Sequence, residues 1–94
     1  MPTLHLISTT LSNELYQQLI TILSDDDVLL FTNQGVYNLY SQQDLLKKYR
    51  CYALMSDLQA YGLLTLVEQT SCKIIDYPEF VQLGILYERS ISWH

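Results

Sequence analysis

An uninterrupted apolar segment, Val28–Phe31, constrains the fold more than any other feature of the sequence. Continuous apolar character is typical of a strand buried on both faces, as in a parallel sheet that lies between helices. The segment ends at polar residues 32–34, and Gly35 follows before the pattern becomes helical. Because glycine adopts backbone angles that other residues resist, the sequence predicts a central strand and a tight turn at Gly35. If φ is positive there, Gly35→Val is expected to destabilise the fold by roughly 1–3 kcal/mol.

The remaining segments can be placed around this strand, because strand-like and helix-like patterns alternate along the chain. Further strands are predicted at 3–7, 51–55 and 73–75, and helices at 13–23, 36–48 with a break at 41–43, 56–61, and from 77 onward. Residues 63–69 fit a loop, a strand or a short helix, and 90–94 are predicted to be a tail. We expect Trp93 in that tail to pack on this domain or on a neighbour.

This alternation predicts one α/β domain over residues 1–94. The predicted architecture is a small three-layer α/β/α sandwich with a mainly parallel sheet of four to five strands, in which right-handed crossovers place helices on both faces. Forty-nine per cent of the residues are hydrophobic, which fits a globular chain. A domain this small covers its apolar residues poorly, so we expect it to form oligomers. Exposed tyrosines and the last helix are expected to supply much of the contact area.

Polar residues that follow the predicted strands have two interpretations. Asp76 and Glu79 have capping-box spacing, and Ser56–Asp57 can cap a short helix that Gly62 ends. In open parallel sheets the same edge holds ligand crevices. The residues expected there are Ser8, Thr9, Asn33, Gln34, Ser56, Asp57, Asp76 and Tyr77. Caps and turns use these same residue types, so capping alone accounts for them.

Charge and hydropathy exclude several classes of function. The net charge of −5 argues against direct nucleic-acid binding, which needs clusters of Lys and Arg. Only Lys47–Arg50 is locally basic, and cations are favourable at a helix C-terminus. No apolar segment approaches the roughly 20 residues of a membrane span, and no secretory signal is visible. We expect a cytoplasmic protein with reduced cysteines.

Few residues are candidates for chemistry. The sequence has no glycine-rich nucleotide loop, no Gly-x-Ser-x-Gly motif and no closely spaced His/Cys set for zinc, so we expect no cofactor and no metal. Asp25–Asp27 is interpreted as a solvated connector and His5 as a structural strand residue. A thiol needs exposure or an electropositive setting to react. Cys72 is the better-exposed candidate, Cys51 is expected to be buried, and both are expected to be inert.

Three segments together resemble the TusB/DsrH family of sulfur-relay subunits, in order, spacing and total length. They are Leu29–Tyr37, Tyr52–Leu63, and Ile75–Leu83 with the closing Ser92-Trp93. The resemblance implies a fold of the DsrE/DsrF/DsrH kind. The residues that it singles out as family-motif or interface positions are Asn33, Gly35, Val36, Tyr37, Asp57, Gly62, Asp76, Tyr77, Phe80 and Trp93.

The resemblance also implies a function. It implies assembly with TusC-like and TusD-like subunits into a dimer of heterotrimers that accepts persulfide sulfur from TusA and passes it toward TusE, for 2-thiolation of the tRNA wobble uridine. The sulfur-carrying cysteine would belong to the TusD-like subunit, and this chain would have no catalytic residue of its own. Two alternatives stay open. One is a DsrH-like subunit of a sulfur-oxidation complex, which the lack of cysteine in Tyr16–Leu19 disfavours. The other is a persulfide carrier that uses Cys72 or Cys51.

Overall fold

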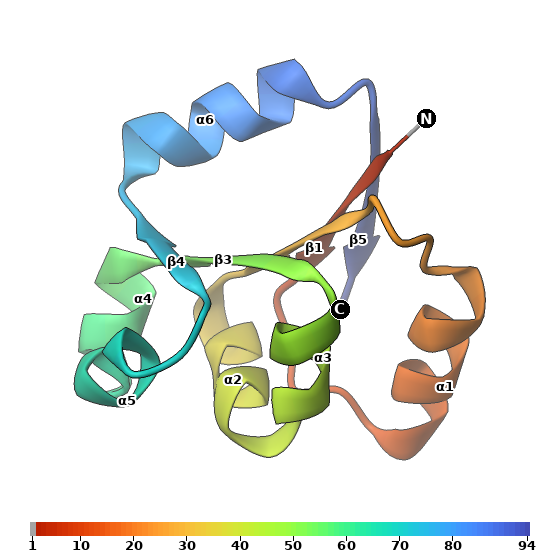
Figure 1. Cartoon of the computed structure of the whole chain (residues 1–94). Helices are drawn as coiled ribbons and strands as arrows, with labels where there is room; N and C mark the ends of the chain where they lie inside the picture. The colour runs from red at the N-terminus through yellow and green to blue at the C-terminus, as the bar shows by residue number, and fades with distance from the viewer. Residues whose placement is uncertain (1) are drawn as a thin grey trace.

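A computed structural model describes residues 2–94 as five parallel strands with helices on both faces. The strand order is β4-β3-β2-β1-β5, so the buried apolar segment forms the central strand (Figure 1). The strands are β1 (Thr3–Ile7), β2 (Val28–Phe31), β3 (Arg50–Leu54), β4 (Lys73–Ile75) and β5 (Arg89–Trp93). All four residues of β2 are buried, as continuous apolar character predicts. The predicted three-layer α/β/α sandwich is confirmed.

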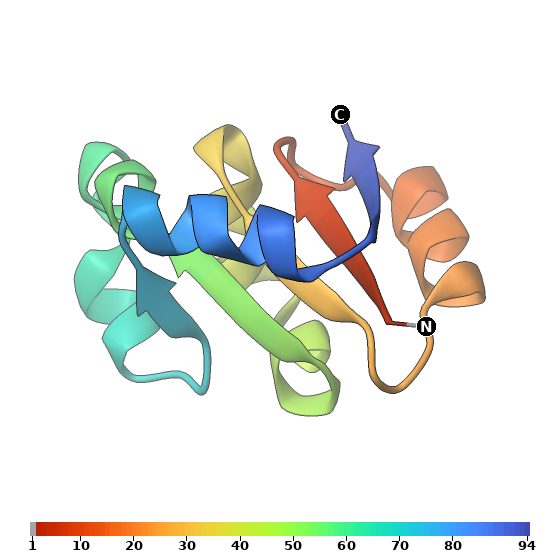
Figure 2. The ribbon, with the colours of Figure 1, turned by 90° about the horizontal axis from the view of Figure 1, so that it is seen from above.

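The helices divide unequally between the two faces. Figure 1 shows α6 (Tyr77–Leu86) alone above the sheet, and Figure 2 shows it lying across the strands. The opposite face is covered by α1 (Asn13–Ile22), the 3₁₀ helix η1 (Asn33–Tyr37), α2 (Asn38–Ser41), α3 (Gln43–Lys48), α4 (Met55–Ala60) and α5 (Leu64–Glu68). The predicted break near 41–43 is confirmed, and the undecided segment 63–69 contains a short helix.

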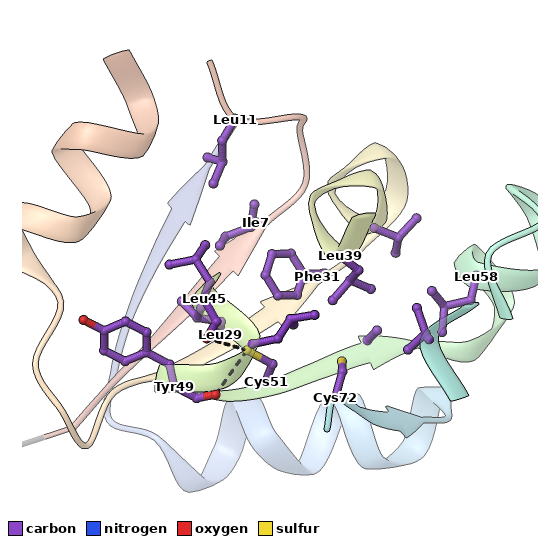
Figure 3. Close-up of a cluster of buried hydrophobic side chains, with 14 of the residues drawn as sticks. Ile7, Leu11, Leu29, Phe31, Leu39, Leu45, Tyr49, Cys51, Leu58 and Cys72 are labelled. Atoms are coloured by element: carbon purple, nitrogen blue, oxygen red, sulfur yellow. Dashed lines mark hydrogen bonds between the residues drawn. The ribbon is translucent and has the colours of Figure 1, made fainter. Parts of the chain in front are cut away.

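The two faces of the sheet carry separate hydrophobic cores of different size. The larger core includes Ile7, Leu29 and Phe31 from the strands, together with buried residues of the 3₁₀ helix and five α-helices (Figure 3). The smaller core lies under α6 and contains only four fully buried side chains: Leu4, Val28, Leu30 and Ile75. Phe80, Leu83 and Tyr87 pack against it and stay partly exposed. The α6 side is therefore the less completely covered side of the domain.

Helix caps agree with the prediction at one place and differ from it at another. The Ser12 side chain accepts from Leu15 N, and Asp76 and Glu79 form the predicted capping box at the start of α6. The prediction that Ser56–Asp57 caps the next helix is wrong, because α4 already begins at Met55. Asp57 therefore lies inside the first turn, and its carboxylate accepts a hydrogen bond from a residue outside its own helix.

The C-terminal segment is a strand and not a tail. β5 pairs in parallel with β1, with Ile7 opposite Trp93. Ser8 N donates to Trp93 O at 3.1 Å, which ties the end of the chain to the loop after β1. The tail prediction was wrong because β5 is an edge strand: residues 89–92 are exposed, and serines alternate with Ile91 and Trp93, so the segment lacks the continuous apolar pattern of a buried strand. Trp93 packs against the larger core of this domain. This is one of the two placements expected for it, on this domain or on a neighbour.

Candidate functional site

The turn after β2 is built by contact with the loop after β1. Thr32 N donates to Ile7 O at 3.0 Å, and Gly35 N donates to Thr32 O at 2.8 Å. The positive φ that the sequence suggested for Gly35 falls instead on Asn33, at 50°. Gly35 is required for a different reason: a Cβ there would overlap Ile7 O and lie 2.7 Å from the Ile7 carbonyl carbon. Glycine thus permits close packing of two backbones at this turn.

A buried asparagine that sequence reasoning missed holds the turn in place. The Asn38 side chain is fully buried. Its Oδ1 accepts from Leu11 N at 2.9 Å, and its Nδ2 donates to Thr9 O at 2.8 Å and Gly35 O at 2.9 Å. These bonds connect the β1–α1 loop to η1. The only signal in the sequence was an amide beside the apolar helical residues Val36 and Leu39.

The outer surface of this turn combines one carboxylate with two aromatic rings. Asp57 Oδ2 accepts from Asn33 N at 2.8 Å. The rings of Tyr37 and Tyr61 are tilted against each other with centroids 5.1 Å apart. Val36, from the same family-like motif, is fully buried below them. The Asp57 carboxylate is already engaged in this hydrogen bond. The turn therefore presents polar and aromatic groups that could contact a partner, and it contains no nucleophile.

The candidate family-motif or interface residues lie in three places. Asn33, Gly35, Val36, Tyr37 and Asp57 meet at the central turn, and Gly62 follows α4 nearby with a φ of +70°. The second place is the start of α6 after β4, at one edge of the sheet, where Asp76, Tyr77 and Phe80 lie. Trp93 is on β5, at the opposite edge. The strand order therefore places these three groups of residues apart along the sheet. The sequence did not indicate this separation, because the three groups contain similar residue types.

Both cysteines are buried in the larger core (Figure 3). Burial raises the pKa of Cys51 to about 12, with a smaller contribution from Cys72, and burial raises the pKa of Cys72 to about 12. Cys51 Sγ lies 3.3 Å from Tyr49 O, to which it donates. Cys72 is the better-exposed thiol, as predicted, but the difference is small, because it is 7% exposed and Cys51 is 3% exposed. Both groups are neutral thiols at physiological pH, and the thiolate is the form that attacks sulfur.

His5 belongs to a buried network that joins β1, β5 and the loop before β2. Its Nε2 lies 3.0 Å from Asp27 Oδ2, and Trp93 Nε1–H donates to its Nδ1 at 3.1 Å. An indole nitrogen only donates, so Nδ1 is unprotonated and Nε2–H donates to the carboxylate. The prediction of a structural histidine is supported by this geometry. Because His5 is 1% exposed and both its ring nitrogens are engaged, neither faces a substrate.

Asp27 is the acceptor at the centre of this network. Thr3 N and Ser24 N donate to its carboxylate at 2.9 Å and 3.1 Å. Burial opposes ionisation, but the hydrogen bonds from His5, Thr3 and Ser24 outweigh it and hold the Asp27 pKa below its usual value. The interpretation of the acidic run as a solvated connector holds for the exposed Asp25 and Asp26 and is wrong for Asp27.

Within residues 2–94, no group of three or more His, Cys, Asp or Glu side chains is arranged to hold a metal ion. None of the helices in that same range has the length and apolar character that crossing a membrane requires.

Comparisons with known proteins cover almost the whole chain. The family model described as "DsrH like protein" matches residues 8–90. Proteins named "Protein TusB" from Salmonella arizonae, Salmonella newport and Salmonella typhimurium are each 28% identical over 95 residues. These alignments span 96% of this chain and 99% of each relative. The family match therefore includes both the central turn and helix α6.

Proposed function

The chain belongs to the DsrH-like family, and on that premise we propose that it is a partner subunit of a cytoplasmic sulfur-relay complex. In this proposal it assembles with TusC-like and TusD-like subunits. The complex passes persulfide sulfur from TusA toward TusE for 2-thiolation of the tRNA wobble uridine. This chain contributes structure and contact surface, and the sister subunit supplies the sulfur-carrying cysteine. The full-length similarity to proteins named TusB supports the assignment to this branch.

The observation that carries the proposal is the state of the two thiols. A persulfide carrier must present a thiolate to its donor and then release the outer sulfur to its acceptor. Cys51 and Cys72 are buried, and both have a pKa of about 12. Thiols with so high a pKa are almost entirely protonated at neutral pH. This disfavours the alternative of a carrier that uses either cysteine.

Co-purification tests the proposal. We expect this chain, tagged and co-expressed with the TusC-like and TusD-like proteins of its own organism, to retain both on affinity and size-exclusion columns. The matched control is the same tag on a small α/β protein unrelated in sequence, which should retain neither. A chain that elutes alone in the presence of both candidates would contradict the proposal.

A further inference from the structure

The C-terminal strand β5 has few buried contacts with the rest of its domain. It lies at the edge of the sheet, and its residues 89–92 are exposed. Of its side chains, Trp93 is the one that packs against the larger core. The backbone of β5 pairs with β1, and Trp93 O accepts from Ser8 N at 3.1 Å and from Ser8 Oγ at 3.2 Å. A strand held by so few buried contacts is one that can open locally while the rest of the domain stays folded.

The indole of Trp93 is bound by a histidine that has to be neutral. Trp93 Nε1–H donates to His5 Nδ1 at 3.1 Å, and His5 Nε2–H donates to Asp27 Oδ2 at 3.0 Å. A protonated imidazole carries a hydrogen on both nitrogens and accepts no hydrogen bond. Protonation of His5 would therefore place two donors, Nδ1–H and the indole Nε1–H, against each other. The hydrogen bond to Trp93 is lost in that state, whereas the bond to Asp27 is kept and becomes an ion pair.

The carboxylate side of the His5 ring is fixed, so the indole is the group that has to move. Asp27 also accepts from Thr3 N at 2.9 Å and from Ser24 N at 3.1 Å. Burial opposes its ionisation, but these hydrogen bonds and the one from His5 hold the Asp27 pKa below the ordinary value of 3.8. Asp27 therefore stays ionised above about pH 5 and attracts the imidazolium.

Asp27 is the one ionisable side chain within residues 2–94 that hydrogen-bonds to His5. Other ionisable side chains lie on the elements beside His5 or next to them, and all of them except the two tyrosines are exposed. They are Glu14, Tyr16, Asp25, Asp26, Tyr49, Glu88, Arg89 and His94. Between about pH 5 and pH 8, a change of charge inside this buried network therefore has to come from His5.

We propose that His5 and Trp93 form a pH-sensitive latch, which holds β5 on the sheet while His5 is neutral and releases it when Nδ1 takes up a proton from solvent. The latched state requires the neutral imidazole, so the released state binds one more proton. The latched population therefore falls as the pH falls through the range in which histidines change charge. Because β5 pairs only with β1, its release leaves β1 as the edge of the sheet.

Amide hydrogen exchange of the full chain at about pH 7.5 and about pH 5.5 tests the latch. Protection factors are corrected for the intrinsic pH dependence of exchange. We expect those of the β5 amides to fall roughly tenfold or more at the lower pH, and those of the central strand β2 to change less than about twofold. The ¹⁵N chemical shifts of the imidazole report at each pH whether His5 Nδ1 is protonated.

Two variants separate the latch from other effects of pH. Trp93→Phe keeps an aromatic ring and removes the Nε1–H donor, so its β5 amides should already be weakly protected at about pH 7.5 and should respond less than about twofold to pH. His94→Asn is the matched control, because it removes the exposed histidine beside Trp93 and leaves the latch intact. We expect this variant to show the full wild-type response.

Three results would each overturn the proposal. The first is equal protection of β5 at both pH values in the wild type, whether or not His5 takes up a proton. The second is a response that disappears in His94→Asn, which would assign it to His94. The third is a response that persists in Trp93→Phe, which would show that the indole hydrogen bond does not hold the strand. If Trp93→Phe does not fold, the wild type and His94→Asn still decide.

Discussion

Gly35→Val is expected to prevent stable folding of the chain. The added Cβ would overlap Ile7 O, and the two backbone segments cannot move apart without breaking the Thr32 N to Ile7 O hydrogen bond of 3.0 Å. We expect a loss of roughly 3 kcal/mol or more in the free energy of unfolding. That is a large part of the roughly 5–15 kcal/mol that stabilises a typical domain. Chemical denaturation, monitored by Trp93 fluorescence, measures the loss in the free energy of unfolding. An insoluble variant would be the extreme form of the expected result.

Gly84→Ala is the matched control for this substitution. Gly84 lies in α6, and a Cβ there meets no atom within 4 Å. Because alanine is favoured over glycine inside a helix, we expect this variant to be more stable by about 0.5–1 kcal/mol. Equal, small effects at both glycines would show that the two backbones at the turn are not in close contact.

Asp27→Asn is expected to be the second most damaging change, with a loss of about 2–4 kcal/mol at pH 7. The carboxylate accepts from Thr3 N, Ser24 N and His5 Nε2. An amide of the same shape has only one acceptor oxygen, and its NH₂ group would face at least one of these donors. Asp25→Asn is the control, because Asp25 is exposed in the same acidic run. We expect no measurable loss there.

The pH dependence provides an independent check on Asp27. Its pKa is lowered in the folded protein from the ordinary value of 3.8, so the unfolded chain takes up the proton first as pH falls. The stabilisation is therefore complete above about pH 5 and is lost progressively below about pH 4. The difference in stability between wild type and Asp27→Asn should narrow over that range. A difference that stays constant down to about pH 3 would show that the charge of Asp27 contributes nothing.

Local patterns predicted the elements, while contacts distant in sequence decided the details. The helical pattern of residues 13–23, the capping box at Asp76 and the apolar β2 segment each determine a structure within one short segment. Such segments predict a mainly parallel sheet, but they do not predict the full order of its strands. β5 was missed because it is an edge strand whose first four residues are exposed, so it lacks the continuous apolar pattern of a buried parallel strand.

The candidate site was predictable only where a motif lies within one turn of chain. Asn33, Gly35 and Tyr37 lie close together in sequence. Asp57, however, is 24 residues from Asn33, its hydrogen-bond partner. Three consecutive aspartates look equivalent in sequence, and only the pairing of β1 with β2 brings Asp27 to His5. Cys72 seemed exposed because polar residues precede it, but packing buries it in the larger core.

Intact-mass spectrometry of the assembled complex during sulfur transfer tests the central claim most directly. After loading with a persulfide donor, the mass of one sulfur atom should appear on the sister subunit's cysteine and be lost on addition of the acceptor. This chain should keep its unmodified mass, with Cys51 and Cys72 recovered as free thiols after denaturation. An added sulfur on this chain that turns over with the acceptor, and that Cys51→Ser or Cys72→Ser abolishes, would contradict the account.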